Sequence, residues 1–267
     1  MSDLKWRFTA KMHGQSDVCR LLRRYPEKVG RSLLSLVKQE GRGLGVELAR
    51  NTRPFGFSEK AKKRGEKAVA SDIAKVFAVP SEAYKDLLRT DKKLADRYWA
   101  AIQNRRFAQA RGILQKSGSA WASIAVGRLD PALHHASRDV TGRVTRHSPA
   151  MIVTGDKARD RYIAKKQRNV GYAKGAWLNA AKALGGRVRG AVQWATRHKT
   201  APGTATVNTS NPSVTLVNNL DYAEAATTRE GVMLALQVAH ARLRKALATS
   251  LRKINERANR DLNRKAS

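Results

Sequence analysis

The sequence predicts an α+β fold in which long N- and C-terminal helices surround a small antiparallel sheet, with a helical insertion in the middle. Two segments near the chain ends, residues 26–52 and 227–254, carry apolar side chains at helical spacing. Two alternating runs, 204–209 and 213–218, flank Asn211-Pro212, a pattern typical of a β-hairpin. Hydrophobic residues make up 42% of the 267 residues, which is enough to form a core.

The N-terminal helix is expected to begin at Pro26, because the fixed φ of proline and its missing N–H are harmless at the first helical position. Residues 1–16, by contrast, are predicted to form an irregular arm. The helix should end before Arg53-Pro54, since a residue that precedes proline is pushed away from helical geometry. Three glycines within residues 41–45 predict a bend or break. The apolar stripe of this helix consists of Val29, Leu33, Leu36, Val37, Leu44 and Leu48.

The middle of the chain, residues 58–160, is predicted to contain a basic loop followed by a mostly helical insertion. Phe55–Lys67 contains glycine and many cations, so we expect an exposed loop there. Ser71–Val79 alternates apolar and polar residues and should form a short strand. Helical spacing resumes after this strand. Glycines and prolines then interrupt residues 120–155, in which only Met151–Val153 has the composition of a strand.

The last part of the chain, residues 161–267, is predicted to hold a helix, the β-hairpin and the C-terminal helix. It should form one domain with the arm and helix of residues 1–57. The pattern Thr227-x-x-Glu230 is a capping box at the start of the C-terminal helix. The polar, basic tail after Glu256 should fray or become ordered against a partner. The apolar stripe of the helix consists of Val232, Leu236, Leu243, Leu247, Leu251 and Ile254.

Positive charge is the strongest compositional feature of the chain. Lys and Arg number 53 against 21 Asp and Glu, which gives a formal net charge of +32. The excess is about +15 in residues 1–116, about +12 in residues 117–200 and about +5 in the remainder. A folded body with this charge repels itself unless a polyanion or a partner screens it, which favours a surface beside nucleic acid. The alternative is a soluble protein that is merely basic.

Two groups of cations are the best candidates for polyanion contact, because Lys and Arg neutralise phosphates without reading sequence. The first group consists of Lys60, Lys62, Lys63, Arg64 and Lys67. The second group consists of Arg159, Arg161, Lys165, Lys166 and Arg168. No zinc-finger or RNA-recognition motif accompanies either group. Runs of charge also occur as solvated faces, and this alternative stays open.

The sequence carries no pattern of a catalytic or cofactor site, and we predict that the chain is not an enzyme and uses no cofactor or metal. Its single cysteine, Cys19, excludes an internal disulfide and a cysteine-based zinc cluster. No histidine has a metal-ligand spacing, and surface positions are the better interpretation even for the adjacent pair His134-His135. Asp156 and Asp160 would share a helix face, but neighbouring cations favour solvated ion pairs over a metal site.

The composition also argues against a membrane protein. No apolar run of signal-peptide length opens the sequence, and no stretch of about 18 uncharged apolar residues occurs in it. We therefore expect no spanning helix, no membrane partner and synthesis in a reducing cytoplasm.

Two segments carry a resemblance to a known family. The first is the run from Asn169 to Gly186. The second is a strand that ends at Asn218, followed by Tyr222-Ala223 and the C-terminal helix. This order resembles the minor tail and tail-completion proteins of tailed bacteriophages. The resemblance covers two ranges, roughly residues 18–57 and 165–255.

The resemblance implies a structural virion protein at the head–tail junction, or neck, made in the host cytoplasm and without catalytic residues. Such proteins assemble as rings between the portal complex and the tail tube. The implied partners are further copies of the chain, a head-side connector or portal protein, tail-tube proteins and genomic DNA, the last by non-specific electrostatics. The implied assembly residues in the hairpin and C-terminal helix are Val214, Leu216, Tyr222, Leu236 and Leu243.

The alternative function is that of a sequence-independent protein that binds or condenses nucleic acid. A ring component should have a fixed stoichiometry and a modest affinity for DNA. A condensing protein should bind duplexes tightly and lose affinity steeply as the salt concentration rises. An enzyme with dispersed catalytic residues is a third, less favoured interpretation.

Overall fold

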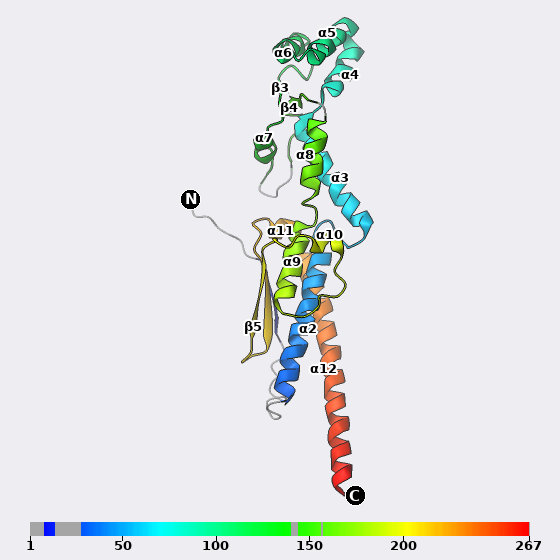
Figure 1. Cartoon of the computed structure of the whole chain (residues 1–267), viewed down its shortest axis with the longest axis vertical. Helices are drawn as coiled ribbons and strands as arrows, with labels where there is room; N and C mark the ends of the chain where they lie inside the picture. Colours follow the sequence, from blue (N-terminus) through cyan, green and yellow to red (C-terminus); the bar gives the residue numbers. More distant parts are fainter. Residues whose placement is uncertain (1–7, 14–27, 140–143, 156, 267) are drawn as a thin grey trace. The chain divides into compact units, whose positions relative to one another are not determined.

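The chain forms two compact units (Figure 1). Unit 1 combines residues 1–62 with residues 171–267, and unit 2 consists of residues 63–170. The sequence-based prediction placed the corresponding borders after residues 57 and 160. The computed structural model describes residues 8–13, 28–139, 144–155 and 157–266. Cys19 and Asp156 lie outside the described residues.

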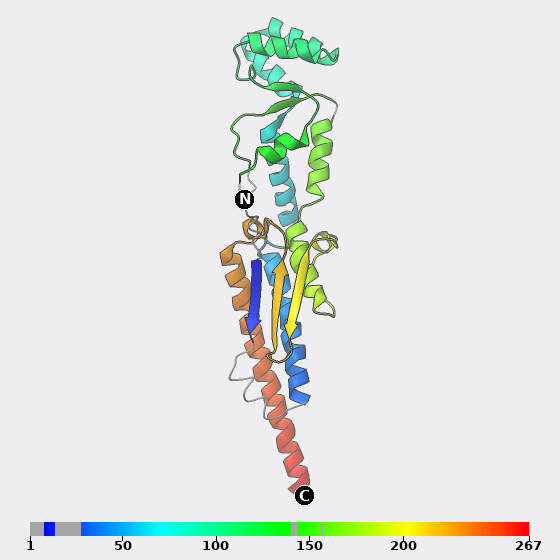
Figure 2. The same cartoon turned by 90° about the vertical axis from the view of Figure 1, so that its left-hand side faces the viewer.

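The described part of unit 1 contains an antiparallel sheet with the strand order β1-β6-β5 (Figure 2). β5 (Gly203–Asn208) and β6 (Ser213–Asn218) confirm the predicted hairpin. β1 (Phe8–His13) pairs with the other side of β6, with Phe8 opposite Asn218. The prediction of an irregular arm is therefore wrong for these residues. β6 offers a second edge for pairing, and apolar residues already alternate along Phe8–His13.

Helices build the rest of unit 1 and confirm the α+β class with long N- and C-terminal helices. Although α12 (Arg229–Ala266) has 38 residues, no described helix is apolar enough over its length to cross a membrane. α12 also continues past Glu256, where the prediction is fraying or ordering against a partner. The helices are α2 (Lys28–Arg50), α9 (Tyr172–Ala183), α10 (Gln193–Thr196), α11 (Ala223–Ala226) and α12 (Arg229–Ala266).

Small residues let α2 approach α9 closely. A Cβ added at Gly45 would lie 2.6 Å from the Cβ of Ala181, and one added at Gly41 would lie 2.9 Å from a methyl carbon of Leu184. Because these glycines face the core, α2 runs unbroken and the predicted break does not occur. The largest fully buried side chains of this unit include Leu44, Leu48, Trp177, Leu178 and Leu216.

Unit 2 has a small parallel sheet with the strand order β2-β4-β3. Its strands are β2 (Phe77–Ala78), β3 (Ala125–Gly127) and β4 (Met151–Val153). One apolar cluster joins the sheet to α4–α6 around Leu87, Tyr98 and Leu114, and another joins α3 and α8 around Phe77 and Tyr162. The helices are α3 (Glu59–Val76), whose first residues belong to unit 1, α4 (Pro80–Thr90), α5 (Lys92–Gln103), α6 (Phe107–Lys116), α7 (Pro131–Ala136) and α8 (Ala158–Gln167).

The predicted basic loop and the predicted strand over residues 71–79 are wrong, because both belong largely to the continuous helix α3. Ala61, Ile73 and Val76 lie at helical spacing and are buried, which gives this helix an apolar side. Ser58 caps its start, since the Ser58 hydroxyl accepts a hydrogen bond from the backbone N–H of Ala61 at 3.1 Å. The strand that follows is limited to the two residues of β2.

Candidate polyanion-binding surface

The first predicted group of cations lies mostly on one exposed face of α3. Its exposed members are three or four residues apart, so they share one side of the helix. Lys75 extends this side about two turns further, and the row spans about 22 Å at the helical rise per residue. We refer to this row as the α3 basic face. It consists of Lys60, Lys63, Arg64, Lys67 and Lys75.

Lys62, the remaining member of the group, is oriented differently. Its side chain is 26% exposed, and its Nζ lies 3.4 Å from Oε2 of Glu59. This contact holds the ammonium along the helix surface, so Lys62 is less available to a polyanion than the α3 basic face.

The second predicted group lies on α8 and separates into three kinds of position. Arg161, Lys165 and Arg168 are exposed and follow one side of the helix. The ammonium of Lys166 lies 5.3 Å from the ring centroid of Tyr162, which the lysine covers. Arg159 points inward.

Arg159 belongs to the internal structure of unit 2. Its Nη1 donates hydrogen bonds to Oε1 of Glu82 at 2.8 Å and to the backbone oxygen of Phe77 at 3.2 Å. Its side chain is only 18% exposed. The prediction that Arg159 contacts a polyanion at the surface is therefore corrected, because a carboxylate and a carbonyl hold it inside.

Within unit 2, the members of the first group from Lys63 onward lie on a helix next to the second group, although about 100 residues separate the two groups in sequence. Gln167 Nε2 of α8 donates a hydrogen bond to the backbone oxygen of Glu66 of α3 at 3.0 Å. Tyr162 packs in the same apolar cluster as Ile73 and Val76 of α3. α3 and α8 are therefore neighbours, and their exposed cations add to one local positive field.

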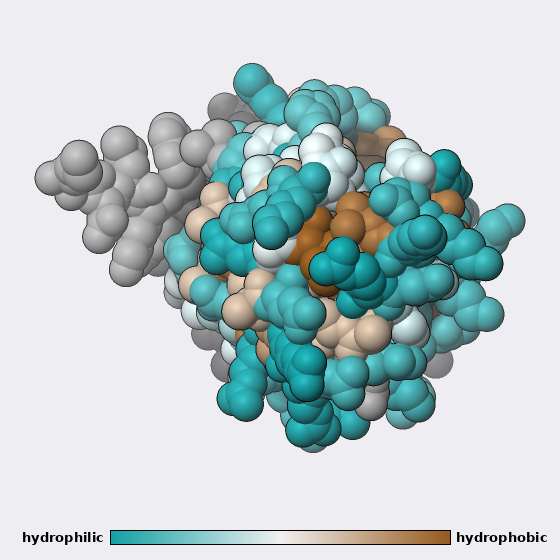
Figure 3. Space-filling view, turned by 90° about the horizontal axis from the view of Figure 1, so that it is seen from above, coloured by the Kyte–Doolittle hydropathy of each residue, from teal (hydrophilic) through white to brown (hydrophobic). Residues whose placement is uncertain are grey.

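The end of unit 2 formed by α4, α5 and α6 is also largely hydrophilic. Figure 3 looks onto this end and shows hydrophilic residues in teal around a small hydrophobic area in brown. Leu88 of α4 is an exposed large hydrophobic residue. The composition of this end favours contact with water or charged groups over an extended apolar interface.

A lysine that the sequence did not single out is the most deeply buried cation among the described residues of unit 1. Lys174 of α9 is fully buried, and its Nζ donates hydrogen bonds to the backbone oxygens of Ala49 at 2.6 Å and Thr52 at 2.7 Å. The rings of Phe57 and Trp194 lie 5.2 and 5.6 Å from this ammonium. Burial lowers the pKa of Lys174 to about 7. Lys174 therefore satisfies carbonyls at the end of α2 and has no access to a ligand.

His134 is buried, and the prediction of a surface histidine is wrong at this position. Its Nδ1 lies 3.1 Å from the hydroxyl of Tyr162, and its Nε2 lies 3.3 Å from Nη2 of Arg138. Burial, followed by the positive charges of Arg138, His135 and Lys166, lowers the pKa of His134 to about 4. In the described part of the chain, no three metal-binding side chains gather at one point.

The predicted assembly residues fall into two classes. Three of them, Val214, Leu216 and Leu243, are only 1%, 0% and 2% exposed, so they belong to the core of unit 1. The prediction that these three residues contact a partner is therefore wrong. Leu236 is half-buried and Tyr222 is 48% exposed. Sequence hydrophobicity alone does not separate a core position from a docking position, and the packing of β6 on α2 decides it.

Asn218, at the end of β6, has a structural role in the segment that resembles the phage proteins. It is fully buried, and its Nδ2 donates a hydrogen bond to the backbone oxygen of Ala173 on α9 at 3.2 Å. Its Oδ1 accepts a hydrogen bond from the backbone N–H of Leu220 at 3.3 Å. The asparagine thus joins the strand to α9 and shapes the turn that leads to Tyr222.

Comparison with known proteins adds no relative. No family model, no curated protein sequence and no solved structure gives a significant match to this chain.

Proposed function

We propose that this chain is a structural virion protein of a tailed bacteriophage, located at the head–tail junction. It works there in tail completion, by assembling with copies of itself and docking to portal-side and tail-tube proteins. Its basic surface then lies near the path of the DNA. The resemblance of the segments around Asn169 and Asn218 supports this proposal, and the outer edge of β5 is the structural observation that carries it.

β5 is a sheet edge without the usual protection. It pairs with β6 on one side, and none of the described strands pairs with its other side. Its sequence, Gly203–Asn208, contains no charged residue and no proline. Natural edge strands commonly use such residues to prevent pairing with other chains. An unprotected edge of six residues is suited to pair with a strand of a second copy or of a neighbouring protein.

The pattern of backbone hydrogen bonds between β5 and β6 identifies which backbone groups of β5 point to its outer edge. The N–H of Asn219 donates a hydrogen bond to the backbone oxygen of Pro202 at 2.9 Å, so these two residues form a bonded pair. Bonded pairs alternate along an antiparallel ladder. Thr206 therefore bonds to β6, whereas the N–H groups of Ala205 and Val207 point outward.

A proline substitution tests the edge directly. Ala205→Pro removes an outward N–H and leaves the bonds between β5 and β6 in place. We expect mass photometry to detect a defined oligomer of the unaltered chain and a shift to monomer in Ala205→Pro. Thr206→Val, which keeps every backbone donor of the strand, is the matched control and should assemble normally. A chain that is monomeric at micromolar concentration, or an Ala205→Pro variant that assembles normally, would contradict self-assembly through this edge.

The proposed location at the head–tail junction can be tested on phage particles. Gold-labelled antibody against the chain, viewed by electron microscopy on particles from the strain that encodes it, should mark the head–tail junction. Label that is absent from particles, with the protein recovered on cellular nucleic acid, would overturn the proposal.

The α3 basic face favours a second candidate function, sequence-independent binding or condensation of nucleic acid. Under this alternative, replacing Lys60, Lys62, Lys63 and Arg64 by alanine should clearly flatten the dependence of duplex affinity on salt, because each lost phosphate contact lowers the slope by about 0.9. Under the assembly proposal, affinity for DNA is modest and the oligomer persists in this variant. Fluorescence anisotropy at several salt concentrations separates the two functions.

A further inference from the structure

Unit 2 contains a cavity at the carboxyl edge of its parallel sheet, and the proposed assembly makes no use of it. The segments that follow all three strands line this cavity: Val79–Ser81 after β2, Arg128 after β3 and Thr154–Gly155 after β4. Parallel strands bring their carboxyl ends to one edge, which is the usual ligand site of open α/β sheets. The cavity volume of about 640 Å³ lies within the range of sites for small molecules.

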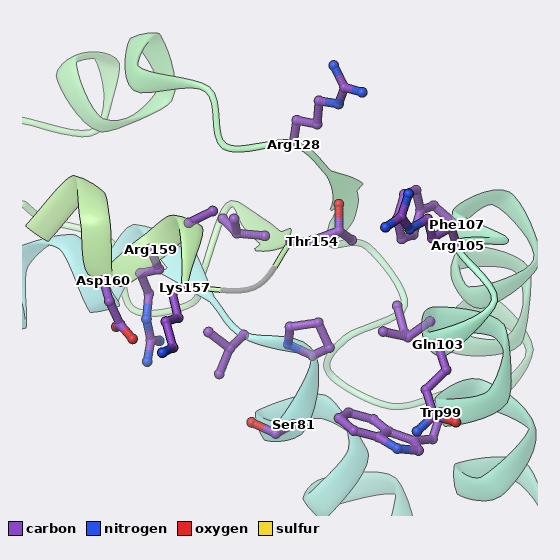
Figure 4. A pocket seen from close by; sticks show the side chains of 16 residues that line it. Ser81, Trp99, Gln103, Arg105, Phe107, Arg128, Thr154, Lys157, Arg159 and Asp160 are labelled. Atoms are coloured by element: carbon purple, nitrogen blue, oxygen red, sulfur yellow. The ribbon is translucent and has the colours of Figure 1, made fainter.

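Cations from separate segments surround the cavity. Figure 4 shows Lys157 and Arg159 on one side, Arg105 on the opposite side and Arg128 on a third, with its guanidinium pointing outward. Asp160 is the single carboxylate among the described lining residues. This balance of charge favours an anionic ligand.

Arg159 is already held in place and keeps one donor unused. Its bonds to Glu82 and Phe77 use Nη1. Its Nε is buried and bonds to no other described residue. Because this Nε is out of reach of solvent, Arg159 contributes a fixed positive charge, shared with Glu82, to the wall of the cavity.

Backbone geometry marks the same cavity. Arg105 and Lys157, with φ of 56° and 59°, are the non-glycine residues with positive φ in the described part of the chain. Glycine adopts this conformation freely, whereas a residue with a Cβ is strained in it. Both strained residues are cations that line this one cavity. Backbone strain of this kind is concentrated at functional sites, such as those where a side chain binds a ligand.

Aromatic side chains form the wall beside Arg105. Trp99 of α5 and Phe107 of α6 line the cavity and are half-buried. The ring of Trp99 is packed against Tyr84, with 5.2 Å between centroids, which fixes its orientation. Flat, partly exposed rings of this kind stack on planar groups of a ligand.

Two helices also begin at the cavity. Phe107 starts α6 and Ala158 starts α8, and neither start receives a side-chain capping bond. The N–H groups at a helix start carry partial positive charge and add to the field of the cations.

We propose that this cavity binds a small phosphate-bearing ligand that carries a flat ring, of the size of a mononucleotide. Arg105 and Lys157 neutralise the phosphate, and Trp99 and Phe107 hold the ring. The site lies wholly within unit 2, so a test of ligand binding and a test of assembly through β5 can fail independently of each other.

Glycine substitutions give the sharpest test, because they remove a cation and relieve the strained backbone together. Isothermal titration calorimetry of the full chain with AMP at low salt should show one saturable site per chain. We expect Arg105→Gly and Lys157→Gly each to weaken AMP binding at least tenfold, with a thermal unfolding midpoint that is unchanged or higher. Arg111→Ala, which removes an exposed cation of α6 outside the cavity, is the matched control and should bind AMP as the unaltered chain does.

Ligand fragments test the two halves of the proposed ligand. Inorganic phosphate and adenosine should each bind at least tenfold more weakly than AMP, because each engages only one wall. Absence of saturable AMP binding, or an equal loss of affinity in Arg111→Ala, would overturn the site. If inorganic phosphate binds as tightly as AMP, the aromatic wall does not hold a ring. If both glycine variants have a lower unfolding midpoint, the backbone of Arg105 and Lys157 is not strained.

Discussion

Unit 1 and unit 2 place their basic side chains in opposite ways. In unit 1, Lys174 is fully buried between two rings and bonds to backbone oxygens. In unit 2, the cations of α3 and α8 lie on exposed helix faces, and others line a cavity. The net charge of +32 therefore has two parts, one that stabilises the fold and another that is exposed to a partner. We expect the two parts to respond differently to substitution, pH and salt.

The largest effect is expected from Lys174→Ala in unit 1. The substitution leaves a cavity between the rings and removes the donor for two buried carbonyls, so unfolding should become easier by about 3 kcal/mol. Urea unfolding followed by tryptophan fluorescence measures the loss. Hydrogen exchange should place it in α2 and α9, with the exchange of α4–α6 unchanged. Equal loss of protection in both units would show that they do not unfold separately.

The stability of unit 1 should depend on pH through Lys174. The pKa of Lys174 is about 7 in the folded chain, below its ordinary value of 10.5. The unfolded chain therefore binds more protons between these two pH values, and stability rises with pH in this window. We expect a gain of about 2 kcal/mol from pH 7 to pH 9.

Lys174→Met is the matched variant for this effect, because methionine fills similar space without a titrating group. Urea midpoints at pH 7, 8 and 9 should rise in the unaltered chain and stay nearly constant in Lys174→Met. Parallel slopes in the two proteins would assign the pH dependence to other groups.

Unit 2 should respond to pH in a different window. Burial and neighbouring cations lower the pKa of His134 to about 4, from an ordinary value of 6.5. Between these values the unfolded chain binds more protons, so stability falls as pH decreases through this window. We expect a loss of about 1.5 kcal/mol from pH 6.5 to pH 5, seen as faster hydrogen exchange in α7 and α8. His134→Gln should reduce this loss, whereas His147→Gln, at an exposed position, should keep it.

The sequence predicted the elements of unit 1 better than those of unit 2. Periodicity and the turn at Asn211-Pro212 act locally, so they identified the hairpin and the last helix. The predicted capping box at Thr227 is wrong by one residue. The hydroxyl of Thr228 accepts the N–H of Gly231, whereas Thr227 is buried and bonds to other side chains of the core. The strand Phe8–His13 carried an alternation that the mixed N-terminal composition obscured. In α3, the many cations favour an exposed loop. Ser58, a typical helix cap, and the apolar spacing after it indicate a helix instead.

The candidate sites were harder to predict than the elements, because tertiary contacts build them. Strands of two or three residues have no measurable periodicity, so the parallel sheet and the cavity at its edge had no local signal. Arg105, Arg128 and Lys157 line the same cavity although they lie far apart in the sequence. Lys174 is buried by α2 and α10, and nothing in its own neighbourhood distinguishes it from an exposed lysine.

The smallest effect is expected at the start of α3, the helix that carries the basic face. Ser58→Ala removes the hydroxyl that accepts the N–H of Ala61, so the first turn should lose about 1 kcal/mol. Hydrogen exchange of the amides of residues 61 and 62 should accelerate, while Ile73 and Val76, buried in unit 2, should keep their protection. Ser58→Asp is the matched control, because aspartate also caps and favours a helix start electrostatically. If Ser58→Ala loosens the whole of α3, the cap stabilises the entire helix. If only the first turn loosens, the basic face has a stable part on unit 2 and a part that depends on its cap.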